Sequence, residues 1–285
     1  PADFRLCLRG KRLVMLGDCM MRYQYLSLVH YLQTGGWGVD TVDPQRLESQ
    51  GGADLPRSIA IGFSLARHKH SGKTDYARFY KASNQMLGGR ETCDCGMGDG
   101  RKGVFGRHEN SVADFVRAKV APLSPSLLVM NIGFWWFKRD YERMGLNASW
   151  WDQVLQASEV ALKSSGGTML LRTTTVPALW RRKDNDGVDQ ELIRSNKVDR
   201  VVLSLVRNRS QAGIGGGGGA KRVSFGVLDT YAMTRYFPTD HCNVRDSRAN
   251  LIKFYSDDMH AQPFVYKEMN TVLFNMVCSR SHQEL

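Results

Sequence analysis

Arg12-Leu13-Val14-Met15-Leu16-Gly17-Asp18-Cys19 is the stretch that decides the fold, because a short apolar run ends there at a tight turn. Such a run, bounded by a turn signal, is typical of a buried strand in a parallel sheet. Residues 20–32 follow without Gly or Pro, carry apolar letters at helical spacing, and stop before Gly35 and Gly36. The sequence therefore predicts a strand, a tight turn and a helix in direct succession.

Other apolar runs repeat this arrangement along the chain. They predict further strands over 58–65, 127–132, 168–173 and 223–229. Helices are predicted over 112–120, 150–163, 189–206 and 263–277. Strands that alternate with helices over the whole length indicate a parallel sheet covered on both faces.

The length of 285 residues fits one large α/β domain or two small ones. We predict a single domain over residues 1–285, a flavodoxin-like three-layer α/β/α sandwich with a central parallel sheet of about five strands. Polar and glycine-rich letters predict loop insertions around 68–110 and 207–222.

The chain carries 39 Lys and Arg against 28 Asp and Glu, a formal net charge of +11. A nucleic-acid partner favours clustered cations, but the cations of this chain are thinly spread, as on a solvated surface. We therefore expect no nucleic-acid partner, whereas attraction to acidic glycans or an anionic membrane surface stays open. No apolar run approaches the roughly 18–20 residues of a membrane helix. Since the chain begins with Pro1 rather than Met, a targeting segment or a membrane anchor outside this stretch also stays open.

The six cysteines are either disulfide-bonded, in an oxidising compartment, or free thiols. Cys93 and Cys95 are too close together for a zinc knuckle and have no matching second pair, so we expect no metal. Cys242 and Cys278 flank the segment 257–260 and are one candidate pair; Cys7 with Cys93 or Cys95 is another. The connectivity stays open.

Polar residues follow the predicted strands at the edge where parallel α/β sheets form their sites. Gly17-Asp18-Cys19 follows the first strand, and Asn131-Ile132-Gly133 ends the central one. Asp257 and His260 precede the last helix at a spacing that places a carboxylate one turn behind an imidazole. A histidine oriented in this way serves as a general base for a nucleophile.

These blocks, in this order, resemble the SGNH (GDSL) hydrolase superfamily, and more closely its PC-esterase and trichome-birefringence-like branch of carbohydrate O-acetyltransferases. Residues 9–24, RGKRLVMLGDCMMRYQ, are similar to the first block of that branch, RGKRLxFVGDSLxRxQ. Residues 128–136, LVMNIGFWW, are similar to its LVFNTGHWW. The pair Asp257 and His260, followed by 262–264 and Asn270, matches the family's D-x-x-H before a closing helix.

The resemblance implies a role for each matched position. Cys19 would be the nucleophile, His260 its base and Asp257 the acid that orients the base. The oxyanion hole would use the Asn131 side chain, the backbone N–H of Cys19, and a glycine that stays open among three candidates, Gly62, Gly88 and Gly89. Substrate contacts are expected from Arg22, Trp135 and Trp136, and the two tryptophans also fit a second interpretation, as core residues or the wall of a cleft. The Asn131 side chain has a second interpretation, in which it satisfies backbone groups at the end of its strand.

Cys19 stands where the family has the nucleophilic Ser. A thiol at a helix N-terminus near an imidazole ionises more readily, although the adjacent Asp18 opposes this. We therefore weigh an active thiol enzyme, acting as a glycan O-acetyltransferase or acetylesterase, against a catalytically degenerate carbohydrate-binding protein. Either protein takes a glycan or another hydroxylated molecule, without a cofactor. A transferase also needs an acetyl donor, and an acyl-donor partner outside this stretch stays open.

The expected location is the lumen of the secretory pathway (Golgi) or the cell exterior. The family resemblance and two N-x-S/T sequons, at Asn147 and Asn208, favour this location.

Overall fold

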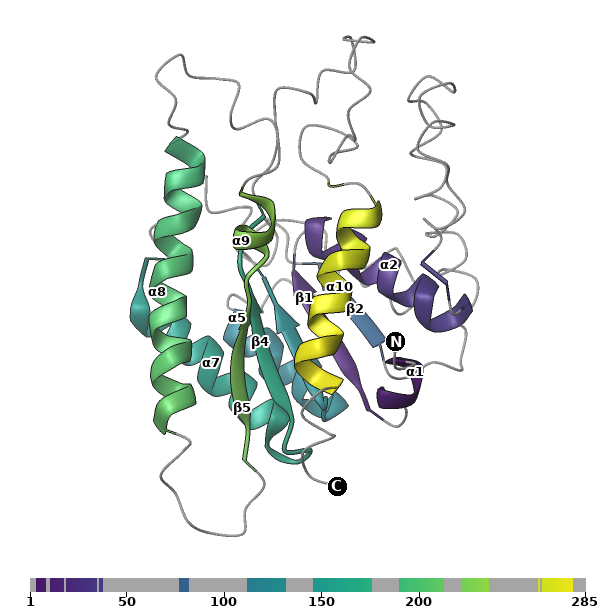
Figure 1. The fold of residues 1–285 in the computed structure, drawn as a ribbon. Coiled ribbons are helices and arrows are strands. Elements are labelled where there is room, and N and C mark those ends of the chain that lie inside the picture. The colour runs from purple at the N-terminus through teal and green to yellow at the C-terminus, as the bar shows by residue number, and fades with distance from the viewer. Residues whose placement is uncertain are drawn as a thin grey trace, which may run out of the picture.

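The structure, a computed structural model, describes residues 4–8, 11–17, 19–34, 36–37, 77–81, 112–131, 146–175, 190–212, 222–235, 261 and 263–278. These residues form an α/β fold in which a parallel sheet is flanked by helices (Figure 1). Its strands are β1 (Leu13–Gly17), β2 (Ala77–Lys81), β3 (Leu127–Met130), β4 (Thr168–Arg172) and β5 (Ser224–Leu228). They pair in the order β2-β1-β3-β4-β5, with every pair parallel.

Strand β1 has a neighbour on each edge, and all of its side-chain positions are buried. Because side chains alternate across a strand, Leu13 and Met15 enter one hydrophobic core while Val14 and Leu16 enter another. A strand that is apolar on both faces needs a cover on each side.

Helices supply both covers. One face is covered by α5 (Val112–Phe115), a π-helical turn (Val116–Val120), α7 (Ala148–Lys163) and α8 (Gln190–Ala212). The other face is covered by α1 (Phe4–Cys7), α2 (Cys19–Thr34) and α10 (Pro263–Cys278). A 3₁₀ turn (Ala121–Leu123) leads towards β3, and the short helix α9 (Thr230–Thr234) follows β5. None of the helices within the described ranges is long and apolar enough to span a membrane.

The strands predicted around β1, β3, β4 and β5 are confirmed, as are the helices that correspond to α2, α5, α7, α8 and α10. The strand predicted over 58–65 lies outside the described residues. Strand β2 is a correction, because it occupies Ala77–Lys81 within the stretch predicted as a loop insertion. Its sequence, ARFYK, carries a charged residue on each side of two aromatic ones, so this edge strand lacks the continuous apolar run that marks the inner strands.

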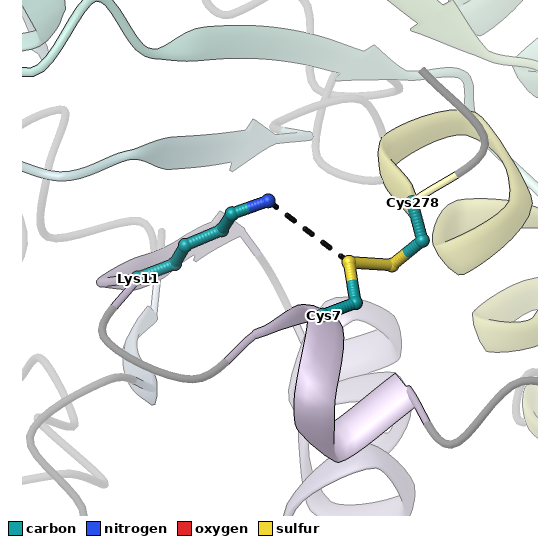
Figure 2. The surroundings of a disulfide bond; sticks show 3 residues. All are labelled: Cys7, Lys11 and Cys278. Atoms are coloured by element: carbon teal, nitrogen blue, oxygen red, sulfur yellow. Dashed lines mark hydrogen bonds between the residues drawn. A yellow bond between two sulfur atoms is a disulfide. The ribbon is translucent and has the colours of Figure 1, made fainter. Parts of the chain in front are cut away.

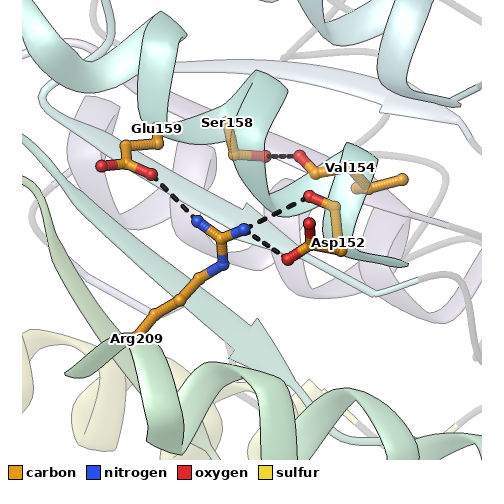
Figure 3. Close-up of polar contacts among 5 residues, drawn as sticks. All are labelled: Asp152, Val154, Ser158, Glu159 and Arg209. Atoms are coloured by element: carbon orange, nitrogen blue, oxygen red, sulfur yellow. Dashed lines mark hydrogen bonds and ion pairs between the residues drawn. The ribbon is translucent and has the colours of Figure 1, made fainter. Parts of the chain in front are cut away.

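The end of α8 is a second correction, since the helix continues to Ala212 through the first residues of the insertion predicted at 207–222. Contacts with its neighbours hold these last turns. Arg209 pairs with Asp152 at 2.5 Å and with Glu159 at 2.9 Å on α7 (Figure 3). Its guanidinium also lies 5.9 Å from the centre of the Phe225 ring on β5. Arg209, within this polar segment, therefore connects α8 to α7 and β5.

A disulfide joins Cys7 at the end of α1 to Cys278 at the end of α10 (Figure 2). The pairs considered from sequence, Cys278 with Cys242 and Cys7 with Cys93 or Cys95, are therefore wrong. Helix α10 packs beside α2 on the same face as α1, which brings its last residue to Cys7 across 271 residues of sequence. Lys11 Nζ lies 4.0 Å from Cys7 Sγ, at the entrance to β1.

We predict that replacing both cysteines, Cys7→Ala with Cys278→Ala, lowers the free energy of unfolding by about 2–4 kcal/mol, since the disulfide restricts the unfolded chain. Urea denaturation of wild type and double variant measures this difference. A non-reducing peptide map should recover the Cys7 and Cys278 peptides joined. Recovery of Cys278 joined to another cysteine would contradict the pairing.

Candidate active site

The carboxyl ends of the inner strands form one level edge. Leu16 pairs with Met130, Met130 pairs with Leu171, and Arg172 pairs with Leu228. The backbone N–H of Asn131 donates to the Leu16 carbonyl at 2.8 Å and extends the pairing of β1 with β3 by one residue. Gly17, Asn131 and Arg172 therefore occupy neighbouring positions at the edge where parallel α/β sheets form their sites.

Gly17 lets helix α2 begin directly above this edge. A Cβ atom on Gly17 would lie 2.7 Å from Cγ of Met21 and 2.8 Å from the backbone oxygen of Asn131. It would also overlap the Cβ of Met21. Cys19 is the first residue of α2, so its backbone lies at the positive end of the helix dipole. The side chains of Cys19 and Arg22 lie outside the described residues.

The Asn131 side chain is buried and directed along the edge. Its Nδ2 donates to the carbonyl oxygen of Arg172 at 2.7 Å, which joins the end of β3 to the end of β4. The interpretation of Asn131 as a partner for strand-end backbone groups is therefore confirmed. A carboxamide nitrogen carries two hydrogens, so this bond also fixes the direction of the second N–H.

Helix α10 is tied to α2 by a buried amide pair. Gln24 Nε2 donates to Asn270 Oδ1 at 3.2 Å, and Asn270 Nδ2 donates to the Gln24 carbonyl at 3.1 Å. Nearby, the rings of Tyr23 and Tyr266 stack with centroids 6.1 Å apart. The Tyr266 hydroxyl accepts the backbone N–H of Ala261 at 3.3 Å, and Ala261 is buried in this cluster. The backbone that directly follows position 260 is thus held beside the first turns of α2.

Asp257, His260, Trp135 and Trp136 lie outside the described residues, as do the candidate glycines at 62, 88 and 89. Among the predicted positions, the structure describes the backbone of Cys19, at the start of α2, and the whole of Asn131, directly after β3.

Sequence reasoning missed the polar segment that leaves β4, Arg172–Thr175, whose residues are all buried. Thr173 Oγ1 donates to Asp229 Oδ1 at 2.9 Å, and the Thr174 N–H donates to Asp199 Oδ2 at 2.9 Å. Thr175 Oγ1 donates to Met20 Sδ at 3.1 Å, which connects the segment to the start of α2. The sequence signal for this segment was a run of polar residues directly after the apolar run of β4.

Asp199 of α8 is buried on the helix face that carries Val198, Val202 and Val206. Burial raises the pKa of Asp199 to about 7, and the nearby Asp229 carboxylate acts in the same direction. Hydrogen bonds from Thr174 and the charge of Arg172 act against this rise in pKa. The sequence signal for Asp199 was an acid within an apolar helical stripe.

No group of three or more His, Cys, Asp or Glu side chains in the described ranges is arranged to hold a metal ion. No protein-family model, curated protein or solved structure matches this chain. The functional interpretation therefore depends on the geometry at the carboxyl edge and on the residues that the sequence places there.

We predict that Gly17→Ala lowers the free energy of unfolding by about 1–3 kcal/mol, because the methyl group would overlap Met21 and the Asn131 backbone. Gly36→Ala is the matched control, since a Cβ atom there meets nothing within 4 Å. Chemical denaturation of the two variants measures the difference. Equal stabilities would contradict the close approach of α2 to the edge.

We predict that the unfolding free energy of wild type falls relative to that of Asp199→Asn as the pH rises from about 5 to about 7. The native state keeps the Asp199 proton up to about pH 7, whereas the unfolded chain releases it near the ordinary pKa of 3.8. The relative loss should reach up to about 1.4 kcal/mol per pH unit.

An asparagine can accept the Thr174 N–H and donate to the Thr174 hydroxyl, so the variant keeps both contacts without the titration. Urea denaturation across this pH range measures both curves. Stabilities that run parallel would show that Asp199 titrates normally.

Proposed function

We propose that this chain is an acyl-ester enzyme of the SGNH type, built as a three-layer α/β/α sandwich with its site at the carboxyl edge of the sheet. Its substrate is a hydroxylated molecule, in the first instance an O-acetylated glycan. Cys19 is the nucleophile, His260 the general base, and Asp257 the acid that orients His260. Asn131 and the backbone N–H of Cys19 hold the oxyanion.

One observation carries this proposal: the first residue of α2 and Asn131 share the edge of neighbouring strands. The Asn131 N–H bonds to Leu16 at 2.8 Å, and the Asn131 backbone oxygen lies against Gly17. These residues belong to the first and second of the family-like blocks, which are separated by more than a hundred residues of sequence. Their juxtaposition is what a nucleophile and an oxyanion donor require.

The position of α10 gives further support. The third block continues through Ala261 into α10, and Ala261 packs with Tyr23 and Tyr266 beside α2. Since Tyr23 follows Cys19 by one helical turn, the packing of Ala261 beside α2 supports our proposal that His260 acts on Cys19. The buried pair of Gln24 and Asn270 fixes α10 against α2.

The proposed reaction proceeds through a thioester. The Cys19 thiolate attacks the acetyl carbonyl, and the tetrahedral oxyanion collapses to an acetyl thioester while the leaving alkoxide takes a proton from His260. His260 then removes a proton from the incoming hydroxyl group, and that oxygen attacks the thioester and releases the thiolate. If the incoming molecule is a sugar the reaction is a transfer, and if it is water the reaction is a hydrolysis.

The thiol in place of a hydroxyl is compatible with this chemistry. The N-terminus of α2 and a protonated His260 both favour the thiolate form of Cys19. Asp18 opposes ionisation through its charge. Arg22 follows Cys19 by nearly one helical turn, and we propose that it contacts the substrate together with Trp135 and Trp136.

A degenerate carbohydrate-binding protein is the second candidate. The observation that favours it is the bond from Asn131 Nδ2 to the Arg172 carbonyl, because a carboxamide with a structural task needs no catalytic one. In that case Cys19 would have replaced the serine nucleophile of an active ancestor.

We place the protein in the secretory pathway or outside the cell. The disulfide between Cys7 and Cys278 supports this location, since such bonds persist in oxidising compartments. Asn147 and Asn208, the two sequon asparagines, are both exposed.

An acetyl-ester hydrolysis assay on wild type, Cys19→Ser and Cys19→Ala tests the function. A thiol enzyme loses at least about 10³-fold in turnover in both variants, since each removes the nucleophile to which the site is adapted. Iodoacetamide should block wild type, with the label on Cys19. The matched control Cys242→Ser, which leaves Cys19 in place, should keep its turnover. Inert wild type together with active Cys19→Ser would favour the degenerate protein.

A further inference from the structure

We propose that Thr173 is a positioning residue for Asn131, an inference that rests on the proposed function because it concerns the oxyanion donor. Thr173 is the first residue after β4 and has a buried side chain. It shares a peptide group with Arg172, whose carbonyl oxygen receives the Asn131 amide at 2.7 Å. Whatever fixes the plane of this peptide group also fixes the direction of the Asn131 carboxamide.

The peptide group lies between two strands. Its N–H, which belongs to Thr173, donates to the Leu228 carbonyl on β5 at 3.0 Å. Its C=O, which belongs to Arg172, points the other way and accepts the Asn131 Nδ2 donor that follows β3. Because a peptide group is planar, a rotation about its axis would move both of these hydrogen-bonding atoms together.

The side chain of Thr173 prevents that rotation. Its hydroxyl donates to Asp229 Oδ1 at 2.9 Å and accepts the backbone N–H of Tyr231 at 2.8 Å. The Thr230 hydroxyl donates in turn to the carbonyl oxygen of Thr173. Asp229 is itself held as the N-cap of α9, through a bond from the Ala232 N–H at 3.0 Å. Thr173 is thus fastened to the turn after β5 by both its side chain and its backbone.

This arrangement has a consequence for catalysis. The bond from Asn131 to Arg172 uses one of two carboxamide hydrogens, and the other hydrogen then has a fixed direction. A donor that is already oriented stabilises an oxyanion without reorganising during the reaction. The structural bond of Asn131 is therefore compatible with its catalytic role, and Thr173 is the residue that maintains the bond.

The test compares Thr173→Val, which keeps the shape and removes the hydroxyl, with Thr173→Ser, which keeps the hydroxyl. Thr234→Val is the matched control, since Thr234 is buried and its hydroxyl donates to the Thr230 carbonyl within α9 at 2.8 Å. We expect Thr173→Val to lower kcat about tenfold with KM within about twofold of wild type, because a misdirected donor weakens transition-state binding alone. Thr173→Ser and Thr234→Val should stay within about twofold in kcat.

A second readout does not depend on activity. The protein is labelled with ¹⁵N-asparagine, and the side-chain amide signal of Asn131 is assigned by its absence in Asn131→Asp. This signal reports how fast the amide hydrogen that Asn131 donates to the Arg172 carbonyl exchanges with solvent. Exchange should be several-fold faster in Thr173→Val than in wild type, Thr173→Ser or Thr234→Val. Faster exchange with no ester turnover in wild type would support the positioning role and reject the proposed function. Unchanged exchange in Thr173→Val would overturn the positioning role, whatever the turnover.

Discussion

At Gly17 the chain passes from β1 into α2 with no room for a side chain. The position of a Cβ atom there is occupied by Met21 from the helix and by the backbone oxygen of Asn131 at 2.8 Å. This close approach places the N-terminus of α2 directly on the edge formed by β1 and β3. The burial of Met20 and Met21, the position of Cys19 and the packing of α10 on α2 all depend on it.

A buried polar network continues from that contact across the sheet. Asn131 binds the end of β4, Thr173 binds the turn after β5, and Thr174 binds Asp199 on α8. Buried polar groups are costly unless they are hydrogen-bonded, so a network of this kind specifies one arrangement of its elements. The carboxyl edge of the sheet therefore has one defined set of hydrogen bonds, which is what the proposed oxyanion site requires.

Local sequence patterns predicted the parts of the fold that are determined locally. Neighbouring residues alone determine the apolar runs of β1, β3, β4 and β5 and the helical spacing of α2 and α7. Asn131 was placed correctly because it directly follows an apolar strand. The pairing of Cys7 with Cys278, the edge strand β2 and the contacts of Thr173 with Asp229 depend on residues far apart in the chain. The contacts of Arg209 and Asp199 could not be predicted for the same reason. Both residues belong to α8, but their partners lie on other elements of the fold.

The proposed acyl transfer depends on the sulfur of Cys19 as nucleophile, and trapping the acyl-enzyme tests that role. Wild type is incubated with an activated acetyl ester, quenched in acid, digested and mapped by mass spectrometry. We expect one acetyl group on Cys19, which hydroxylamine removes as it removes a thioester, and a lower yield of it in Asn131→Ala than in wild type. An unmodified Cys19 under conditions in which the ester is consumed, or a Cys19 recovered in a disulfide, would exclude Cys19 as the nucleophile.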